Sequence, residues 1–387
     1  VVSHDQLDYH YAPPLRVLYR ETYRLTKAIP LRRAGHLLTV SRWGAAFLRG
    51  PMGLRDTTFV TNGVDPGQFR PATPEDRAAL RESLGFTRFT VLIPGRFTPE
   101  KNQWMSVRAA RHAPELDFVF VGDMDSSVGT LAQAALNSGT RLPMRRIFAG
   151  GGPVFPRTLE LLSRAAPQAE LVSVYGSTEA EPIAHQSWQA VTPADQARTR
   201  QGGGLLAGKP VPELHALVLP QQAGPLEYRN FTALQGAALA PGQVGELLVS
   251  GGHVHPGYLD GRGDEETKWK DPGGDVVWHR TGDAATFDEQ GRLWLMGRAG
   301  KSVQDEHGEL FPFAVEAAAM THPAVRRVAL LPGKRVLCVE WENEPDSTLK
   351  EMLAWAHLHE IRSVRRIPLD RRHNAKVDYV QLQKQLG

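Results

Sequence analysis

The stretch "VSVYGSTEAEPIA", residues 172–184, places an aromatic ring, a glycine, hydroxyl groups and two carboxylates directly after an apolar run. The apolar run predicts a buried strand, and the polar residues after it predict a loop at the end of that strand. Such a loop is either an ordinary tight turn or a holder for a nucleotide and its metal. The rest of the chain has to decide between these two interpretations.

Short β-rich runs alternate with helical patterns on both sides of this stretch, which predicts an α/β architecture. From Leu214 onward, strands separated by Gly and Pro turns predict a smaller β-rich subdomain. After Arg298 the pattern predicts a compact α/β tail. The sequence predicts strands at "HLLTV", "FTVLIPG", "LDFVFVG" and "RRIFAGG", and helices at "NQWMSVRAARHA" and "PRTLELLSRAAP".

Composition excludes several classes of protein. The 387 residues leave room for two or three domains, and 41% hydrophobic with 22% charged residues is ordinary for a globular chain. A net charge of +3 with scattered Lys and Arg does not favour nucleic-acid binding. No apolar run approaches the roughly 18 residues of a membrane span, so we expect a cytoplasmic protein of undetermined oligomeric state. The single cysteine, Cys338, lies in an apolar run and is interpreted as a core thiol.

The first part of the chain carries an ordered set of motifs: "GHLLTVSRWGAAFLR", "FVTNGVDPGQFRP", "VLIPGRFTPEKNQ" and "LDFVFVGD". Over about residues 1–123 this set resembles the middle of a family-4 retaining glycosyltransferase with two Rossmann-like halves. The resemblance implies that Arg96 and Lys101 bind the diphosphate of a sugar nucleotide, where their charges neutralise phosphate. The donor-site segment and most of the acceptor half of such enzymes are not found in the chain.

The remaining chain carries a second series: "LPMRRIFAGGGPVFP", "VYGSTEAEP", "GKPVPELHALVL", "GELLVSGGHVHPGYL", "WHRTGD", "RLWLMGR" and "IPLDRRHNAKVDY". From about residue 130 to residue 387 this series resembles the acyl-adenylate-forming superfamily of AMP-dependent synthetases and ligases. The wording is similar to long-chain acyl ligases of the olefin-biosynthesis type, which include β-lactone synthetases. The resemblance implies activation of a small-molecule carboxylic acid with ATP and Mg²⁺, with CoA as a further cofactor in some members.

The first half of the predicted nucleotide site lies around the opening stretch. Gly151 and Gly152 lack side chains, which permits close backbone approach to adenine, and Tyr175 offers a ring to stack on the base. Thr178 is expected to contact phosphate, and Glu179 to coordinate Mg²⁺ as a hard oxygen ligand. The plainer interpretation is a glycine turn, a core tyrosine and a glutamate at the start of a following helix.

Later motifs complete the predicted site. Asp283 of "HRTGD" is expected to bind the ribose hydroxyls, assisted by Arg298 of "MGR". Lys376 of "RRHNAKVDY" matches the family lysine that bridges the acyl carboxylate and the α-phosphate, where a mobile point charge stabilises developing negative charge. The resemblance also implies that the tail rotates about Gly300, although family members usually carry Asp or Lys there. Taken alone, these residues would be a turn aspartate, a surface arginine and a solvated lysine.

Other patterns are weaker. "GGLLAGKP" nearly matches a phosphate-binding loop, but Pro210 replaces the hydroxyl residue that would hold Mg²⁺. "HVH" at 253–255 and "HLHE" at 357–360 have metal-ligating residues, but spacing suggests no third ligand. The "TSGTTGxPKG" loop, which cradles the β- and γ-phosphates of ATP in the superfamily, does not occur in the sequence.

Three functions therefore stay open. The first is an AMP-forming ligase that activates a fatty or β-hydroxy fatty acid and passes it to CoA or to lactone formation. The second is a nucleotide-sugar-dependent glycosyltransferase, and the third is a non-catalytic fusion of two truncated enzymes. The predicted fold is a partial Rossmann-like half-domain fused to an incomplete adenylate-forming domain with a β-rich subdomain and a small mobile α+β C-terminal domain. The predicted domain boundaries are 1–125, 126–297 and 298–387.

Overall fold

The computed structural model of the chain divides into two compact units, Val1–Thr87 and Arg88–Gly387. The structure describes residues 2–3, 17, 21–22, 31–33, 35–50, 52–54, 56–60, 71–83, 86–94, 103–121, 132–133, 135–137, 139, 141–142, 144–258, 260–271, 274, 276–370 and 376–386.

The first unit contains a small parallel sheet. Helix α2 begins after Ser41, whose side chain accepts a hydrogen bond from the backbone N–H of Gly44 at 2.9 Å. Its buried face, with Leu48, packs with Leu37 and Met52. The described elements of this unit are β1 (Val2–Ser3), β2 (Leu37–Thr39), α2 (Arg42–Arg49), β3 (Thr57–Phe59) and α3 (Pro74–Ser83).

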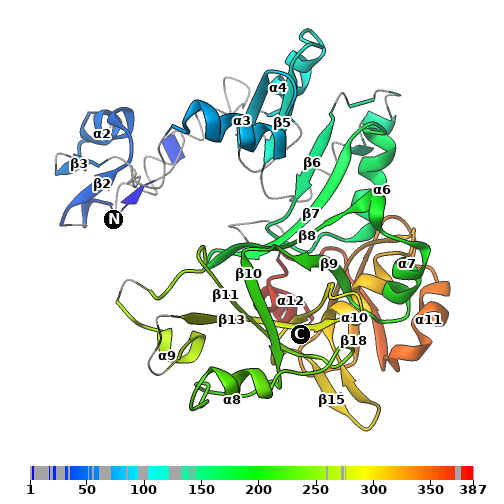
Figure 1. Cartoon of the computed structure of the whole chain (residues 1–387). Coiled ribbons are helices and arrows are strands. Elements are labelled where there is room, and N and C mark those ends of the chain that lie inside the picture. The colour runs from blue at the N-terminus through cyan, green and yellow to red at the C-terminus, as the bar shows by residue number, and fades with distance from the viewer. Residues whose placement is uncertain are drawn as a thin grey trace. The chain divides into compact units, whose positions relative to one another are not determined.

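The second unit is built on an 11-stranded mixed sheet, in the order β10-β11-β13-β14-β9-β8-β7-β6-β5-β4, with β12 paired to β13 (Figure 1). Strands β4 to β7 are parallel, with helix α4 between β4 and β5 and helix α6 between β6 and β7 as the crossovers that parallel pairing requires. Helix α6 starts with Pro156 and buries Leu159 and Leu162 against Ile147 and Leu171 of the sheet. These elements are β4 (Thr90–Pro94), α4 (Gln103–Ala110), β5 (Asp117–Val121), β6 (Arg146–Ala149), α6 (Pro156–Ala165) and β7 (Glu170–Ser177).

The other strands of the sheet pair antiparallel and share a core that includes Ile183, Leu247, Val249 and Leu293. The strands predicted as a separate β-rich subdomain therefore continue the main sheet. The elements are β8 (Ala180–Ser187), η2 (Trp188–Ala190), α7 (Pro193–Arg200), β9 (Leu205–Pro210), β10 (Leu214–Leu219), α8 (Phe231–Gly236), β11 (Gly245–Gly251), α9 (Asp264–Thr267), β12 (Lys268–Lys270), β13 (Val277–Phe287) and β14 (Leu293–Arg298).

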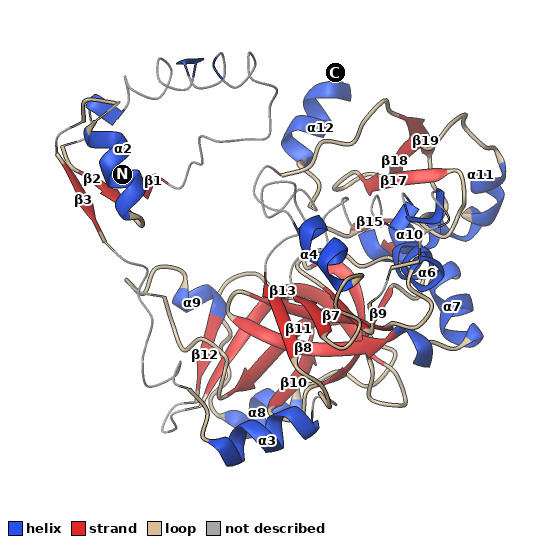
Figure 2. Ribbon diagram, turned by 90° about the horizontal axis from the view of Figure 1, so that it is seen from above, coloured by secondary structure: helices blue, strands red, loops and turns tan. Residues whose placement is uncertain are grey.

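The chain after Arg298 forms the expected α/β tail. In Figure 2 the three-stranded sheet β17-β18-β19 lies close to α11 and α12. Helix α10 packs against both β14 and β17. The elements are β15 (Val303–Asp305), β16 (Gly308–Leu310), α10 (Pro312–Ala319), β17 (Val325–Leu330), β18 (Val336–Trp341), α11 (Thr348–Met352), η3 (Ala354–Ala356), β19 (Glu360–Ser363) and α12 (Tyr379–Leu386).

The compact units do not follow the predicted boundaries at residues 125 and 297. The first boundary falls between β5 and β6, which pair at Phe120 and Ile147 within one sheet, and the compact units meet between Thr87 and Arg88. The domain boundaries themselves stay predictions. Contacts of α10 with β14 keep the tail in the same unit as the sheet. The mixed α/β architecture itself is confirmed. Among the helices that the structure describes, none is long and apolar enough to cross a bilayer.

Candidate nucleotide site

The opening stretch forms a β-hairpin. Thr178 and Glu179 are the two turn residues between β7 and β8, and Ser177 pairs with Ala180 across the turn. The register shifts just before the turn, at Gly176, where a Cβ would come 3.0 Å from the carbonyl oxygen of Ala180. The interpretation of Glu179 as a residue at the start of a helix is wrong, because a strand follows it.

One large cavity brings the predicted residues together. It measures about 1980 Å³, larger than the roughly 300–1,000 Å³ of ordinary ligand pockets. Its walls include the end of β7, residues 279–283 of β13, the end of β14 and the tail after Arg298. Its lining includes all eight residues that the adenylate-forming resemblance assigns to the site: Gly151, Gly152, Tyr175, Thr178, Glu179, Asp283, Arg298 and Lys376.

A hydrogen-bonded trio forms one wall of the cavity. The Tyr175 hydroxyl donates to Oδ2 of Asp283 at 2.7 Å, and Nη1 of Arg298 donates to Oδ1 of the same carboxylate at 3.0 Å. Asp283 and Arg298 are directly opposite each other on β13 and β14. Burial, followed by the negative charge of Asp283, raises the pKa of Tyr175 well above its usual value, so the hydroxyl stays a donor.

Glycine is required beside this trio. Gly282 has φ +69°, and a Cβ there would lie 2.7 Å from Nη2 of Arg298. A side chain would therefore be strained by the backbone and would also displace the guanidinium from its present position. The "TGD" sequence thus positions Asp283 through a left-handed backbone conformation inside strand β13 that glycine adopts easily.

The carboxylate of Glu179 is ionised and held in place. Burial would raise its pKa, but hydrogen bonds to its own backbone and from the Tyr258 hydroxyl lower the pKa below its usual value. The Tyr258 hydroxyl donates to Oε1 at 3.1 Å, and the backbone N–H of His255 donates to the carbonyl of Glu179 at 2.7 Å. A fixed, charged oxygen ligand that lines a cavity fits the chemistry of Mg²⁺.

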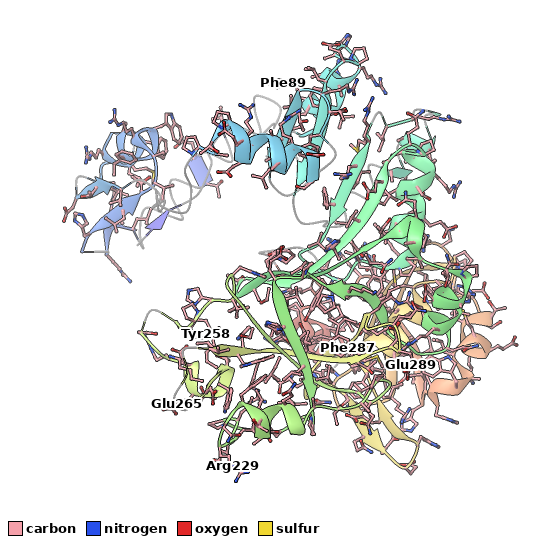
Figure 3. The ribbon with its side chains drawn as sticks, viewed as in Figure 1. Phe89, Arg229, Tyr258, Glu265, Phe287 and Glu289 are labelled. Carbon is pink, nitrogen blue, oxygen red and sulfur yellow. The ribbon has the colours of Figure 1, made fainter. Side chains whose placement is uncertain are left out.

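Three residues beside Glu179 carry no role in the sequence analysis. Tyr258, labelled in Figure 3, lies on the loop after β11, with the Nζ of Lys268 5.6 Å from its ring centroid. Lys268 is buried, and burial lowers its pKa while the charge of Glu179 opposes that shift. Burial and the charge of Lys268 lower the pKa of His279, whose Nδ1 lies 3.2 Å from the carbonyl oxygen of Thr267. The "GYL", "ETKW" and "WHRTGD" sequences contain Tyr258, Lys268 and His279, but only folding brings them to the hairpin turn.

Lys376 lines the cavity from a bend and not from a strand. Its side chain is exposed, and its backbone carbonyl accepts a hydrogen bond from the Asp370 N–H at 2.8 Å. Leu369 and Val377 form an isolated bridge next to it. The lysine is therefore held through its backbone, while its ammonium group keeps rotational freedom.

A buried carboxyl group supports the tail beneath this loop. Glu316 of α10 accepts hydrogen bonds from the Leu330 N–H at 2.8 Å and from the Tyr379 hydroxyl at 3.3 Å. Burial raises the pKa of Glu316 to about 7. Glu316 also lines the cavity, and the sequence analysis did not single it out.

Other predicted residues have different outcomes. Arg96 and Lys101, which the glycosyltransferase resemblance assigns to a sugar nucleotide, lie outside the described residues. Cys338 is buried on β18, and burial raises its pKa to about 11, as expected for a core thiol. The "LLAGKP" segment forms strand β9. Gly300 has φ +70°, a Cβ added there would meet nothing within 4 Å, and its N–H donates to Oε1 of Gln221 at 2.9 Å.

Comparison with known proteins supports the adenylate-forming resemblance. Residues 113–259 match the family model of AMP-binding enzymes. An olefin β-lactone synthetase of Xanthomonas campestris is 31% identical over 274 residues, which are 64% of this chain and 48% of that protein. A medium-chain acyl-CoA ligase of Bos taurus is 27% identical over 207 residues, which are 54% of this chain and 30% of that ligase. The chain spans about half the length of the olefin β-lactone synthetases that it matches.

Solved structures show the same fold. The amide bond synthetase McbA from Marinactinospora thermotolerans has a TM-score of 0.59 at 19% identity, over 94% of this chain and 78% of that one. The O-succinylbenzoate coenzyme A synthetase from Bacillus subtilis, solved with AMP, has a TM-score of 0.55 at 16% identity, over 94% and 81%. Such coverage takes in most of residues 1–125, so a separate glycosyltransferase-like half-domain and a fusion receive no support.

Proposed function

We propose that this chain carries the adenylate-binding part of an AMP-forming carboxylic acid ligase. The observation that carries the proposal is the convergence of the predicted nucleotide residues on one cavity. In this proposal Tyr175 and the glycines hold adenine, Asp283 and Arg298 hold the ribose, and Thr178 contacts phosphate. Lys376 bridges the acyl carboxylate and the α-phosphate, and residues 298–387 act as the mobile C-terminal domain.

The metal and the substrate follow from the same site. Glu179 would hold Mg²⁺, which neutralises phosphate charge when bound. The similarity to olefin β-lactone synthetases and to a medium-chain acyl-CoA ligase supports a fatty or β-hydroxy fatty acid as the substrate. CoA or internal lactone formation would then receive the acyl group.

The test is pyrophosphate release from ATP and Mg²⁺ with a panel of fatty and β-hydroxy fatty acids. The full chain is expected to show acid-dependent release, and Lys376→Ala to lose it. The matched control is Lys384→Ala. Lys384 is also an exposed lysine, but it lies on α12. Acid-independent release, or equal release by wild type and Lys376→Ala, would contradict the proposed ligase.

A second candidate is adenylate binding without turnover. It is favoured by one sequence observation, because no Ser/Thr/Gly-rich loop of the superfamily type occurs to grip the β- and γ-phosphates. This candidate predicts that AMP binds while no acid in the panel supports pyrophosphate release. The two measurements together separate the candidates.

A further inference from the structure

Two imidazoles and a carboxylate meet on the surface of the tail. Glu306 and His307 form the turn between β15 and β16, and His359 lies just before β19. Each side chain offers one ligand atom, and these atoms all lie within 4.8 Å of one another. Only His359 of the "HLHE" sequence belongs to this group. Glu306 and His307 come from a hairpin about fifty residues earlier, so the sequence alone does not bring the three ligands together.

One buried arginine fixes both segments. Arg335 is only 2% exposed, and its Nε donates to Oδ2 of Asp305 at 2.6 Å while its Nη2 donates to the Gly308 carbonyl at 2.7 Å. On the other side, Nη1 donates to the Ala356 carbonyl at 2.6 Å, and the Arg335 carbonyl accepts from the His359 N–H at 2.8 Å. The hairpin turn and the segment before β19 therefore share one rigid support.

Further contacts orient His307. Oδ1 of Asp305 accepts a hydrogen bond from the His307 backbone N–H at 2.9 Å. The His307 ring stacks on His357, with centroids 4.6 Å apart and 7° between the planes. His357 has φ +46°, a conformation that few residues other than glycine adopt. A stacked ring and a fixed turn reduce the freedom that a ligand would otherwise lose on binding a metal.

We propose that Glu306, His307 and His359 bind one divalent transition-metal ion, with zinc as the best fit. Two imidazoles and one carboxylate are a known zinc donor set, and an exposed position leaves the fourth coordination site to water. Hard ions such as Mg²⁺ prefer oxygen ligands, so two imidazoles select against them. None of these three residues lines the nucleotide cavity, so the site is independent of the proposed ligase. The ion would link the β15–β16 hairpin to the segment before β19.

The test uses the full chain without a histidine tag, freed of metal by a chelator and titrated with Zn²⁺ by calorimetry. Wild type is expected to bind one equivalent. His359→Ala and His307→Ala are each expected to weaken binding by at least about 10-fold, the lower limit for a supporting residue. The matched control is His215→Ala, which removes an exposed histidine on β10 and should bind like wild type.

Two more readouts guard against misfolded variants. Far-UV circular dichroism checks each fold, and His359→Gln provides a milder second variant. The visible spectrum of Co²⁺ added to wild type should report a site of low coordination number that His359→Gln loses. A wild type that binds no Zn²⁺, or a His359→Gln that matches wild type in affinity and stoichiometry, would overturn the proposed site.

Discussion

The two walls of the nucleotide cavity are built differently. On the sheet side, Tyr175, Asp283 and Arg298 come from three strands and are joined by hydrogen bonds. On the tail side, an exposed Lys376 and a buried Glu316 both line the cavity. Under the proposed function the difference teaches that binding and chemistry place different demands on a site. A pre-organised wall would hold ribose and adenine, whereas the lysine that stabilises charge in the transition state would need freedom to move.

The largest expected effect comes from the tail wall. Lys376→Ala should reduce acid-dependent pyrophosphate release by about 10²–10³-fold, because one electrostatic contact to the transition state is lost. AMP binding by this variant should stay close to that of wild type. Steady-state assays measure pyrophosphate release, and calorimetry measures AMP affinity. A parallel loss of AMP affinity would show that Lys376 contributes to nucleotide binding.

The pH dependence of stability tests the support beneath Lys376. Burial raises the pKa of Glu316 from an ordinary 4.5 to about 7, so the folded protein keeps the proton more tightly than the unfolded chain. This stabilising contribution is complete below about pH 4.5 and is lost as the pH rises through about 7. The free energy of unfolding of wild type relative to Glu316→Gln should fall by about 3 kcal/mol across that window.

Urea unfolding of both proteins at about pH 5 and about pH 8.5 measures this difference. Glu316→Gln keeps an oxygen that accepts from the Leu330 N–H, so it is a close match in shape and bonding. Parallel pH profiles of the two proteins would show that the carboxyl group does not titrate in this range.

A smaller effect is expected on the sheet wall. Asp283→Ala should weaken AMP binding by about 10- to 100-fold, as expected for the loss of hydrogen bonds to a charged group. Glu289→Ala is a matched control, because Glu289 is an exposed carboxylate on the turn between the same two strands (Figure 3). Calorimetric titration with AMP checks both, and equal affinities would remove Asp283 from the nucleotide site.

The smallest predicted effect concerns Tyr175, whose ring and hydroxyl group can be tested separately. Tyr175→Phe keeps the ring and loses only the hydrogen bond to Asp283, so AMP affinity should fall by about 5-fold. Tyr175→Ala should weaken binding further, because the stacking surface is lost as well. If the two variants bind AMP equally, the ring does not contact adenine.

Much of the sheet and of the site could be predicted from sequence because the signals are local. The strand of the opening stretch, helix α6 and the tail strand around Cys338 follow from apolar runs and periodicity. Asp283 and Arg298 were predicted from short motifs, and strand pairing then puts them opposite each other. Motif order identifies residues that meet, even when the distance between them along the chain is large.

The residues that were not predicted depend on contacts between distant segments. Tyr258 and His279 lie inside motifs of the sequence analysis without a role of their own, and Lys268 lies outside those motifs. Only the approach of their elements to the β7–β8 turn brings them to Glu179. The sequence indicates only that Glu316 belongs to a helix, because its burial depends on the packing of the tail. The continuity of the sheet across residue 125 was also missed, because a change of motif family along a chain does not require a break in hydrogen bonding.

The central claim is that the cavity of the second unit binds an adenylate. The most direct measurement is calorimetric titration of the full chain with AMP and, in parallel, with UDP. The structure predicts one equivalent of AMP bound, binding weakened by about 10- to 100-fold in Asp283→Ala, and no heat from UDP. Binding of UDP without AMP, or AMP binding that Asp283→Ala leaves unchanged, would contradict the account.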